Sequence, residues 1–408
     1  MCLLSTRELQ LASLRLCTEC RKVPTLRLIV EDITPRHLLA TAADTFPSYR
    51  KEQSSSRVPR LRARGVTWML QSAYHFNSPL PTLNDVTYLE FDDAFNQSVD
   101  GVAWPPRLQQ VKFGYSFNIE IEKVPWPASI RQLTFGDRFN RPVSGVAWPA
   151  SLQQLTFGRH FNQPIAGIAW PKSLLVMTFG ECFSQPMNEV AWPSSLQQLS
   201  CGHAFNHSIA EVVWPESLLQ LSFGGEFNQS IDGVIWPPLL QKLKFGHSFN
   251  QPIADVKWPE ALLHLSFGPR FKTPYKQITW PPSLQHLTFS CFVDHDMAEV
   301  LWPAALQQLT FEQRFNEPIE GVIWPSSLQQ LTFGAAFNLP IEGVVFPPSL
   351  VQLTFGVGFD QPIEGVAWPS SLRLLAFVWR FNRPVEGVRW PPSLQTLTFG
   401  RMFDQPIE

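Results

Sequence analysis

The sequence is poor in the features that mark several common functional classes. No apolar run reaches the roughly 20 residues that a membrane-spanning helix needs. Charged residues make up only 16% of the 408 positions and the net charge is −2, which disfavours a general nucleic-acid-binding face. A phosphate-binding glycine loop, a nucleophile elbow and a well-placed acid–base pair are also missing. We therefore expect neither an enzyme nor a cofactor, and neither a nucleic-acid nor a membrane partner.

Cysteine is also scarce. The chain has six cysteines without regular spacing, and Arg7 and Glu8 interrupt the position where a signal peptide needs its apolar core. This usage favours a reducing compartment, so we expect a cytoplasmic location, with the nucleus as the alternative. The pair Cys17 and Cys20 lacks the second pair that a zinc site would need, and no metal site is predicted.

The dominant feature is a repeat of 22 residues. Phe recurs at this spacing from Phe95 to Phe403, and Val293 occupies the single slot without it. Self-similarity at a short fixed period indicates a solenoid, in which each coil contacts mainly its neighbours. We assign residues 95–402 to fourteen coils, 65–94 to degenerate first coils, and 403–408 to an incomplete coil. That last segment predicts either a fragment or an open end that stacks on a partner.

The residues before the repeats differ in charge. Residues 1–64 carry 12 Lys/Arg and 6 Asp/Glu, a net charge of +6, whereas residues 65–408 carry 20 and 28, a net charge of −8, and the two sum to −2. Residues 1–50 are predicted to form a small helical N-terminal module, and the plainer interpretation of it is a cap on the solenoid. The polar, basic segment 51–64 predicts a linker.

Each coil contains one segment with the period of a strand. In Gln154–Phe157, Leu and Phe alternate with Gln and Thr. Fourteen such segments predict one long parallel sheet with roughly 4.8 Å between coils, and hence a mainly β fold. Gly158 follows the strand and is expected to permit a tight turn. Cys201 stands where other coils have Phe, which predicts a buried thiol.

A Trp–Pro pair marks a second corner of the coil. Pro follows an aromatic residue in all fourteen coils, and a Pro in every coil predicts a turn because it cannot donate a sheet hydrogen bond. We interpret the Trp residues as a structural column along the core, with Phe346 as the one exception. The column comprises Trp104, Trp126, Trp148, Trp170, Trp192, Trp214, Trp236, Trp258, Trp280, Trp302, Trp324, Trp368 and Trp390.

An asparagine follows the repeated Phe in most coils. A buried amide at one fixed position could bond the backbone of adjacent coils in a ladder. Such burial would argue against glycosylation at the three N-x-S matches within the series. The ladder residues are Asn96, Asn118, Asn140, Asn162, Asn206, Asn228, Asn250, Asn316, Asn338 and Asn382.

The shared pattern resembles the FNIP repeat, a relative of the leucine-rich repeat. In one coil the match is carried by Leu152, Leu155, Phe157, Phe161, Asn162, Pro164 and Ile165. The resemblance implies a leucine-rich-repeat-like solenoid that binds protein. Family members are often F-box proteins, whose N-terminal module recruits a ubiquitin-ligase scaffold while the repeats hold the substrate. Residues 23–50, with Val23–Pro24 and a later Leu38–Leu39, are the segment that would have to supply that module.

Candidate sites lie where coils depart from the consensus. Basic residues cluster on three adjacent coils, together with Ser266 and Tyr275, and would suit an acidic peptide or a phosphate group. The alternative is neutral drift on a solvated face. The candidate residues are Lys242, Lys244, His247, His264, Arg270, Lys272 and His286.

Two acidic features are further candidates. Glu320, Glu342, Glu364 and Glu386, followed by Glu408 at the end of the sequence, recur once per coil and could attract a basic partner or a cation. Recent duplication of a solvated edge is the plainer explanation. The segment 292–297 replaces the consensus with Asp294, His295 and Asp296, and we interpret it as a degenerate coil.

Two functional classes remain open from the sequence. One is a scaffold that binds a protein or peptide, including a substrate adaptor that reaches a ubiquitin-ligase scaffold through the N-terminus. The other is a structural, self-associating repeat array. An adaptor must bind its scaffold protein through residues 1–50, whereas an array would assemble in a concentration-dependent way.

Overall fold

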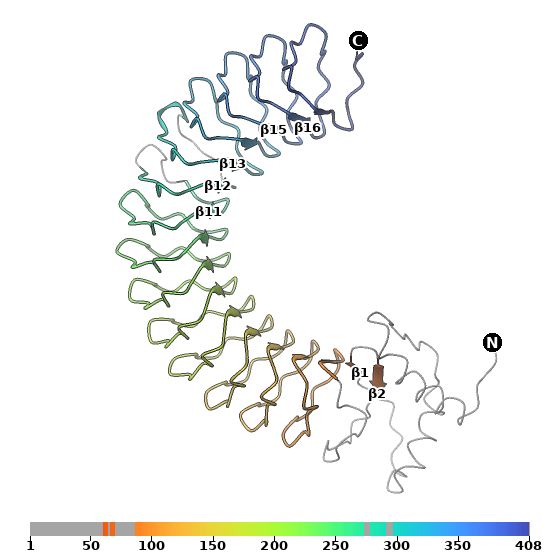
Figure 1. Cartoon of the computed structure of the whole chain (residues 1–408), viewed down its shortest axis with the longest axis vertical. Coiled ribbons are helices and arrows are strands. Elements are labelled where there is room, and N and C mark those ends of the chain that lie inside the picture. Colours follow the sequence, from red (N-terminus) through yellow and green to blue (C-terminus); the bar gives the residue numbers. More distant parts are fainter. Residues whose placement is uncertain (1–59, 64–65, 70–85, 273–277, 291–296, 408) are drawn as a thin grey trace, which may run out of the picture.

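The computed structural model describes residues 60–63, 66–69, 86–272, 278–290 and 297–407. Within them the chain winds into a curved solenoid with one 17-stranded sheet (Figure 1). The predicted N-terminal module 1–50 and much of segments 51–64 and 65–94 lie outside the described residues. The strands are β1 (Arg60–Ala63), β2 (Val66–Met69), β3 (Tyr88–Phe91), β4 (Gln110–Lys112), β5 (Gln132–Thr134), β6 (Gln154–Thr156), β7 (Val176–Thr178), β8 (Gln198–Ser200), β9 (Gln220–Ser222), β10 (Lys242–Lys244), β11 (His264–Phe267), β12 (His286–Phe289), β13 (Gln308–Phe311), β14 (Gln330–Thr332), β15 (Gln352–Phe355), β16 (Leu374–Phe377) and β17 (Thr396–Thr398).

The sheet is parallel from β3 to β17. Each strand pairs with the next so that residue i faces residue i+22, as in the series Gln132, Gln154 and Val176. The one helical element among the described residues is the short 3-10 helix η2 (Met297–Glu299). The predicted long parallel sheet of 22-residue coils is therefore confirmed.

The N-terminal edge of the sheet differs from the sequence prediction. Strand β1 pairs antiparallel with both β2 and β3, so the order at this edge is β2–β1–β3. Residues 60–63 are thus part of a strand and not the end of a linker. The linker was predicted from the basic charge of the segment. The signal for a strand was also present, because Leu61 and Ala63 alternate with Arg60 and Arg62, which is the period of a strand.

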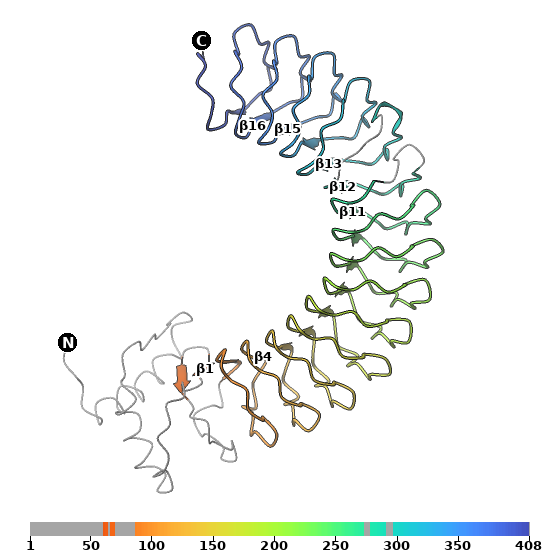
Figure 2. The ribbon, with the colours of Figure 1, turned by 180° about the vertical axis from the view of Figure 1, so that it is seen from behind.

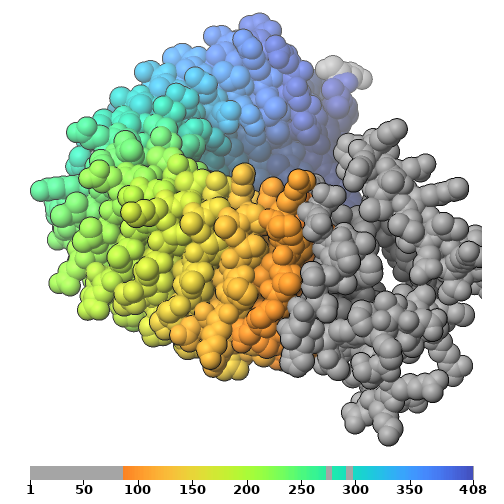
Figure 3. Space-filling model, turned by 60° about the horizontal axis from the view of Figure 1, so that its bottom comes forward, coloured from red at the N-terminus to blue at the C-terminus, as the bar shows by residue number. Residues whose placement is uncertain are grey.

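The strands line the inner side of the arc, as both ribbon views show (Figures 1 and 2). Strands of a parallel sheet repeat at roughly 4.8 Å. On the opposite limb of the coil, five pairs of neighbouring Trp residues stack with ring centres 5.5 to 6.5 Å apart. The larger spacing on that limb bends the stack toward the sheet. Successive coils still pack into a continuous surface (Figure 3).

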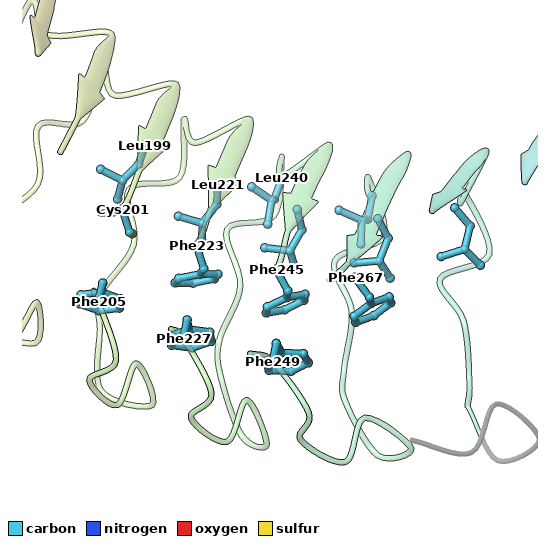
Figure 4. Packing of buried hydrophobic residues seen from close by; sticks show 14 of the residues in the cluster. Leu199, Cys201, Phe205, Leu221, Phe223, Phe227, Leu240, Phe245, Phe249 and Phe267 are labelled. Carbon is cyan, nitrogen blue, oxygen red and sulfur yellow. The ribbon is translucent and has the colours of Figure 1, made fainter. Parts of the chain in front are cut away.

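Two phenylalanines per coil fill the core. Phe113 and Phe117 stack at 3.9 Å within one coil, and each stacks on its counterpart in the next coil at 5.6 and 6.0 Å. Figure 4 shows these pairs one coil after another, with Cys201 in the slot that Phe223 fills in the next coil. Cys201 is buried, as the sequence predicts, and burial raises the pKa of its thiol far above the ordinary value.

A tight turn opens at the glycine after the strand, as predicted, since the N–H of Phe161 donates to the carbonyl of Gly158 at 3.3 Å. The structure adds a second reason for glycine at this position. A Cβ placed on Gly158 would lie 1.9 Å from the carbonyl oxygen of Gly136, and Gly180 has the same relation to Gly158. Each glycine therefore packs directly on the backbone of the preceding coil. Positive φ angles occur instead at the outer turn, for example 70° at Gly167.

The asparagines form a ladder between coils. The backbone N–H of Asn118 donates to Oδ1 of Asn96 at 2.8 Å, and Asn140 donates in the same way to Asn118 at 2.9 Å. The expectation that these amides are buried was wrong, because their side chains are exposed or half-buried. The argument against glycosylation that rested on burial is removed with it. The amide needs to be only at the edge of the core, since its acceptor oxygen reaches a backbone N–H that lies there.

A second ladder was not predicted. In most coils a serine in the turn before the strand donates its hydroxyl to a backbone carbonyl of the previous coil, and the acceptor is the Leu or Ile that precedes the strand there. Examples are Ser173 to Leu152 at 2.6 Å and Ser195 to Leu174 at 2.7 Å. The signal was available, since Ser precedes this Leu in most coils. Both ladders link residues 21 or 22 apart and hold neighbouring coils in register.

The Trp–Pro corner is a turn, as the sequence predicts. The N–H of Leu174 donates to the carbonyl of Pro171 at 3.1 Å. The indole rings are buried or half-buried, but the Nε1 atoms of twelve of the Trp residues are buried without a hydrogen-bond partner. These indoles therefore contribute packing area and carry an unsatisfied donor.

Candidate functional site

The strands place four of the predicted basic residues side by side. Lys242, His264 and His286 face one another across β10, β11 and β12. Lys244 lies next to Ser266 in the same register. Because Leu243 and its equivalents are buried, the side chains on either side of them point away from the core, toward the inner side of the arc. We call Lys242, Lys244, His264 and His286 the inner basic patch.

The two histidines of the patch are in direct contact. Their rings stack at 4.2 Å with an angle of 11° between the planes. His286 Nδ1 lies 2.8 Å from Oε1 of Gln308, so Nδ1–H donates to the amide oxygen when it carries the proton. This bond orients the His286 ring and leaves Nε2 available to a ligand.

Charge and burial tune His264. Its partial burial, followed by the neighbouring His286 and Lys242, lowers the pKa of His264 below the ordinary value of 6.5. An anion bound between these groups would reverse the effect of the cationic neighbours and favour the protonated ring. The inner basic patch is thus suited to a ligand whose negative charge compensates the positive charge of the patch.

The surrounding sheet contains no compensating acid. Strands β4 to β17 include no Asp or Glu, and the Glu of β3, Glu90, is paired with Lys112 at 3.0 Å. The inner basic patch is therefore the main charged feature of a strand surface that otherwise carries mostly Gln, Thr and Ser. The nearest strand-end carboxylate, on Glu312, accepts a hydrogen bond from the Ser290 hydroxyl.

The remaining basic candidates do not join this patch directly. His247 and Arg270 lie in the loops that follow the strands, and the N–H of Arg270 donates to the carbonyl of His247 at 3.1 Å. Lys272 replaces an asparagine of the ladder, and its N–H donates to Oδ1 of Asn250 at 2.7 Å. Tyr275 lies outside the described residues. The structure therefore separates a strand cluster of four residues from three residues farther along the coil.

The glutamate column lies at the outer turn. All four side chains are exposed, and each precedes a glycine with positive φ. A Cβ placed on Gly343 would lie 3.6 Å from Oε1 of Glu320, and Gly365 has the same relation to Glu342 at 3.5 Å. Each of these carboxylates therefore leans over the glycine of the next coil. Glu408 and the divergent residues Asp294, His295 and Asp296 lie outside the described residues.

A groove that the sequence analysis missed runs across the coils of β4 to β8. Its volume is about 840 Å³, and its lining includes Gly136, Gly158 and Gly180. Its lining carries both charges, and Arg159 is paired with Glu181 at 2.8 Å. The signal in the sequence was the unbroken series of glycines after the strand Phe, which leaves this line without side chains.

Two kinds of site are not found in the described part of the chain. No group of three or more His, Cys, Asp or Glu residues there is arranged to hold a metal ion. No helix among those residues is both long and apolar enough to cross a bilayer.

Comparisons with known proteins agree with the geometry. Residues 139–182, 227–256, 249–292, 315–358 and 337–378 match the family described as FNIP Repeat. The crystal structure of CroV588, described as a novel circular LRR protein, is 38% identical to this chain, with a TM-score of 0.65. That match covers 78% of this chain and 50% of CroV588, so the chain spans half the length of that protein. An internalin (inlF) from Listeria monocytogenes is 12% identical over 78% of this chain and 88% of its own, with a TM-score of 0.46. Curated protein sequences give no match.

Proposed function

We propose that this chain, an FNIP-repeat protein with a leucine-rich-repeat-like solenoid, is an interaction scaffold that binds an acidic segment of a partner protein on the inner side of its arc. The observation that carries the proposal is the inner basic patch, which places Lys242, Lys244, His264 and His286 together on a strand surface without carboxylates from β4 onward. Acidic side chains or phosphate groups would make charge-assisted bonds to these four groups.

A labelled, unstructured Glu-rich peptide is a suitable probe, with binding measured by fluorescence anisotropy. The double variant Lys242→Gln/Lys244→Gln should weaken binding roughly tenfold or more, because it removes two charge-assisted contacts. Lys257→Gln is the matched control, since Lys257 is also exposed but lies on the opposite limb of the coil. Equal affinity for the double variant and the control would overturn the proposal.

The histidines add a pH signature to the same experiment. A bound carboxylate favours the protonated imidazole, so peptide affinity should rise as the pH falls through 6.5 toward the lowered pKa of His264. The charged groups that face this ring are Lys242 and His286, and neither gains negative charge over that range. Affinity that falls with pH in the same window would contradict a role for the histidines.

A substrate-adaptor role in a ubiquitin ligase is a more specific version of the scaffold function. It depends on residues 1–50, which lie outside the described residues, and its support is the family resemblance. Affinity purification with mass spectrometry should compare the full chain with one lacking residues 1–64. Ligase components that copurify only with the full chain would support the adaptor role, and their absence from both would refute it.

A further inference from the structure

A second surface lies on the limb of the coil that returns from the glutamate turn to the Trp–Pro corner. On this return limb Val322 and Trp324 are buried, and Ile323 between them points outward with 77% of its surface exposed. Leu301 and Val345, at the same position in the two adjacent coils, are 77% and 79% exposed. These side chains have no packing role in the fold, and three aliphatic residues in a row mark a contact surface more than scattered exposure does.

The stripe has a regular spacing. Trp302 and Trp324, the neighbours of Leu301 and Ile323 in the chain, have ring centres 6.2 Å apart. An α-helix advances about 5.4 Å per turn and presents side chains on one face every three or four residues. A helix that lies along the array, across the coils, can therefore place one apolar side chain beside each residue of the stripe.

The glutamate column runs beside the stripe. The carboxylate of Glu320 leans over Gly343, which is two residues before Val345 in the chain. Two residues span at most about 7 Å, so the acidic and apolar lines lie within reach of one helix. None of the ion pairs among the described residues involves a member of this column. Four like charges thus remain without a cationic partner from the described chain.

We propose that a basic amphipathic helix of a partner protein docks on the return limbs of these coils. Its apolar face covers Leu301, Ile323 and Val345, and its Lys or Arg residues on one flank face Glu320, Glu342 and Glu364. This surface is separate from the inner basic patch and has the opposite charge, so the two surfaces select different partners. The proposal stands whether or not the inner patch binds an acidic segment.

The chain supplies its own control. Ile235 occupies the same return-limb position as Ile323 and is 83% exposed. The outer turns of the coils around it carry Glu211, Asp232 and Asp255, so acidic charge is present there but is not aligned at one position of the coil. The stripe position of the next coil is Lys257, which would repel a basic helix. A basic helix that needs three aliphatic residues in a row and an aligned acidic column should therefore depend on Ile323 and not on Ile235.

The probe is a synthetic helical peptide built from Leu, Ala and Lys, with Leu on one face and Lys on the flanks. A second peptide with Glu in place of every Lys tests charge. Binding of both to the full chain is measured by fluorescence anisotropy at low and high salt. Ile323→Ser should weaken binding of the basic peptide about tenfold or more, whereas Ile235→Ser should leave it unchanged. Glu342→Gln/Glu364→Gln should weaken it several-fold and flatten its salt dependence.

Each outcome decides the proposal. The expected result is binding of the basic peptide alone, with the loss confined to Ile323→Ser and the glutamate variant. Equal binding of the basic and acidic peptides, or equal effects of Ile323→Ser and Ile235→Ser, would overturn it. Sedimentation that shows self-association of the full chain, abolished by Ile323→Ser, would assign the stripe to a second copy instead. Circular dichroism of each variant verifies that the solenoid is intact.

Discussion

Replacing Trp236 by Phe should leave the stability of the solenoid nearly unchanged, although the indole is one of the largest buried groups in its coil. Trp236 is 7% exposed, its ring stacks on Trp258 at 6.5 Å, and its Nε1 atom is buried without a hydrogen-bond partner. The protein already contains the substitution once. Phe346 occupies this position in its own coil, is buried, and stacks on Trp368 at 6.0 Å.

Two opposing contributions set the magnitude. Loss of the larger ring removes on the order of 40 Å² of buried apolar area, which costs about 1 kcal/mol in the free energy of unfolding. Loss of the unsatisfied N–H removes a desolvation penalty of about 1–3 kcal/mol. The net change should therefore be within about 1 kcal/mol of zero, or slightly stabilising. Trp236→Ala, in contrast, leaves a cavity and should cost about 3–5 kcal/mol.

Urea unfolding followed by circular dichroism measures both variants against the parent chain. Since repeat proteins can unfold in segments, hydrogen exchange of the coils around residue 236 should accompany it. A destabilisation by Trp236→Phe of more than about 3 kcal/mol, close to that of the alanine variant, would refute the reasoning. It would mean that the indole N–H is stabilised in solution and that the Trp column is more than a packing element.

Three further predictions concern the backbone contacts and the patch. Gly180→Ala should cost about 3 kcal/mol or more in unfolding experiments, because its Cβ would collide with a backbone carbonyl that cannot withdraw without separating two coils. Asn228→Ala should cost about 1 kcal/mol, whereas Asn228→Asp should cost less because an Asp oxygen serves the ladder in the same way at Asp360; thermal melts of the two variants compare them. The pKa of His264 is lowered in the folded chain, so its contribution to stability is present above pH 6.5 and is lost as the pH falls from 6.5 toward the lowered pKa. When the pH is lowered through this window, the melting temperature of the His264→Gln variant should therefore fall less than that of the parent chain.

The sequence was sufficient for the parts of the molecule that follow from periodicity. Alternation of Leu and Phe with Gln and Thr identified the strands, and the constant spacing of 22 residues determined which residues pair across them. The contact between His264 and His286 follows from the same two facts, because in-register parallel strands bring residues i and i+22 together. The strand cluster of the inner basic patch was predictable for this reason.

Features outside the strands were less predictable. Lys272 follows the buried Phe271 and leaves the strand surface, although it is close to the patch in sequence. The asparagine ladder was anticipated in its bonding but not in its exposure, because a repeated residue does not reveal how far its side chain reaches from the core. The glycine column was correctly placed at a turn, but the approach of two coils at these glycines was not predicted, because it is a long-range contact that no local pattern encodes. The groove over β4 to β8 follows from that same contact.

The two ladders and the glycine column have a consequence for how such an array can change in length. Every one of these contacts joins a residue to another about 22 positions away, so duplication or loss of one whole coil restores each donor to an equivalent acceptor. An insertion of a single residue within a coil would break the asparagine ladder, the serine ladder and the glycine contact at once. The number of coils is therefore free to vary among descendants of such a gene, while the length of each coil is held constant, and new surfaces such as the glutamate column can spread by copying a coil.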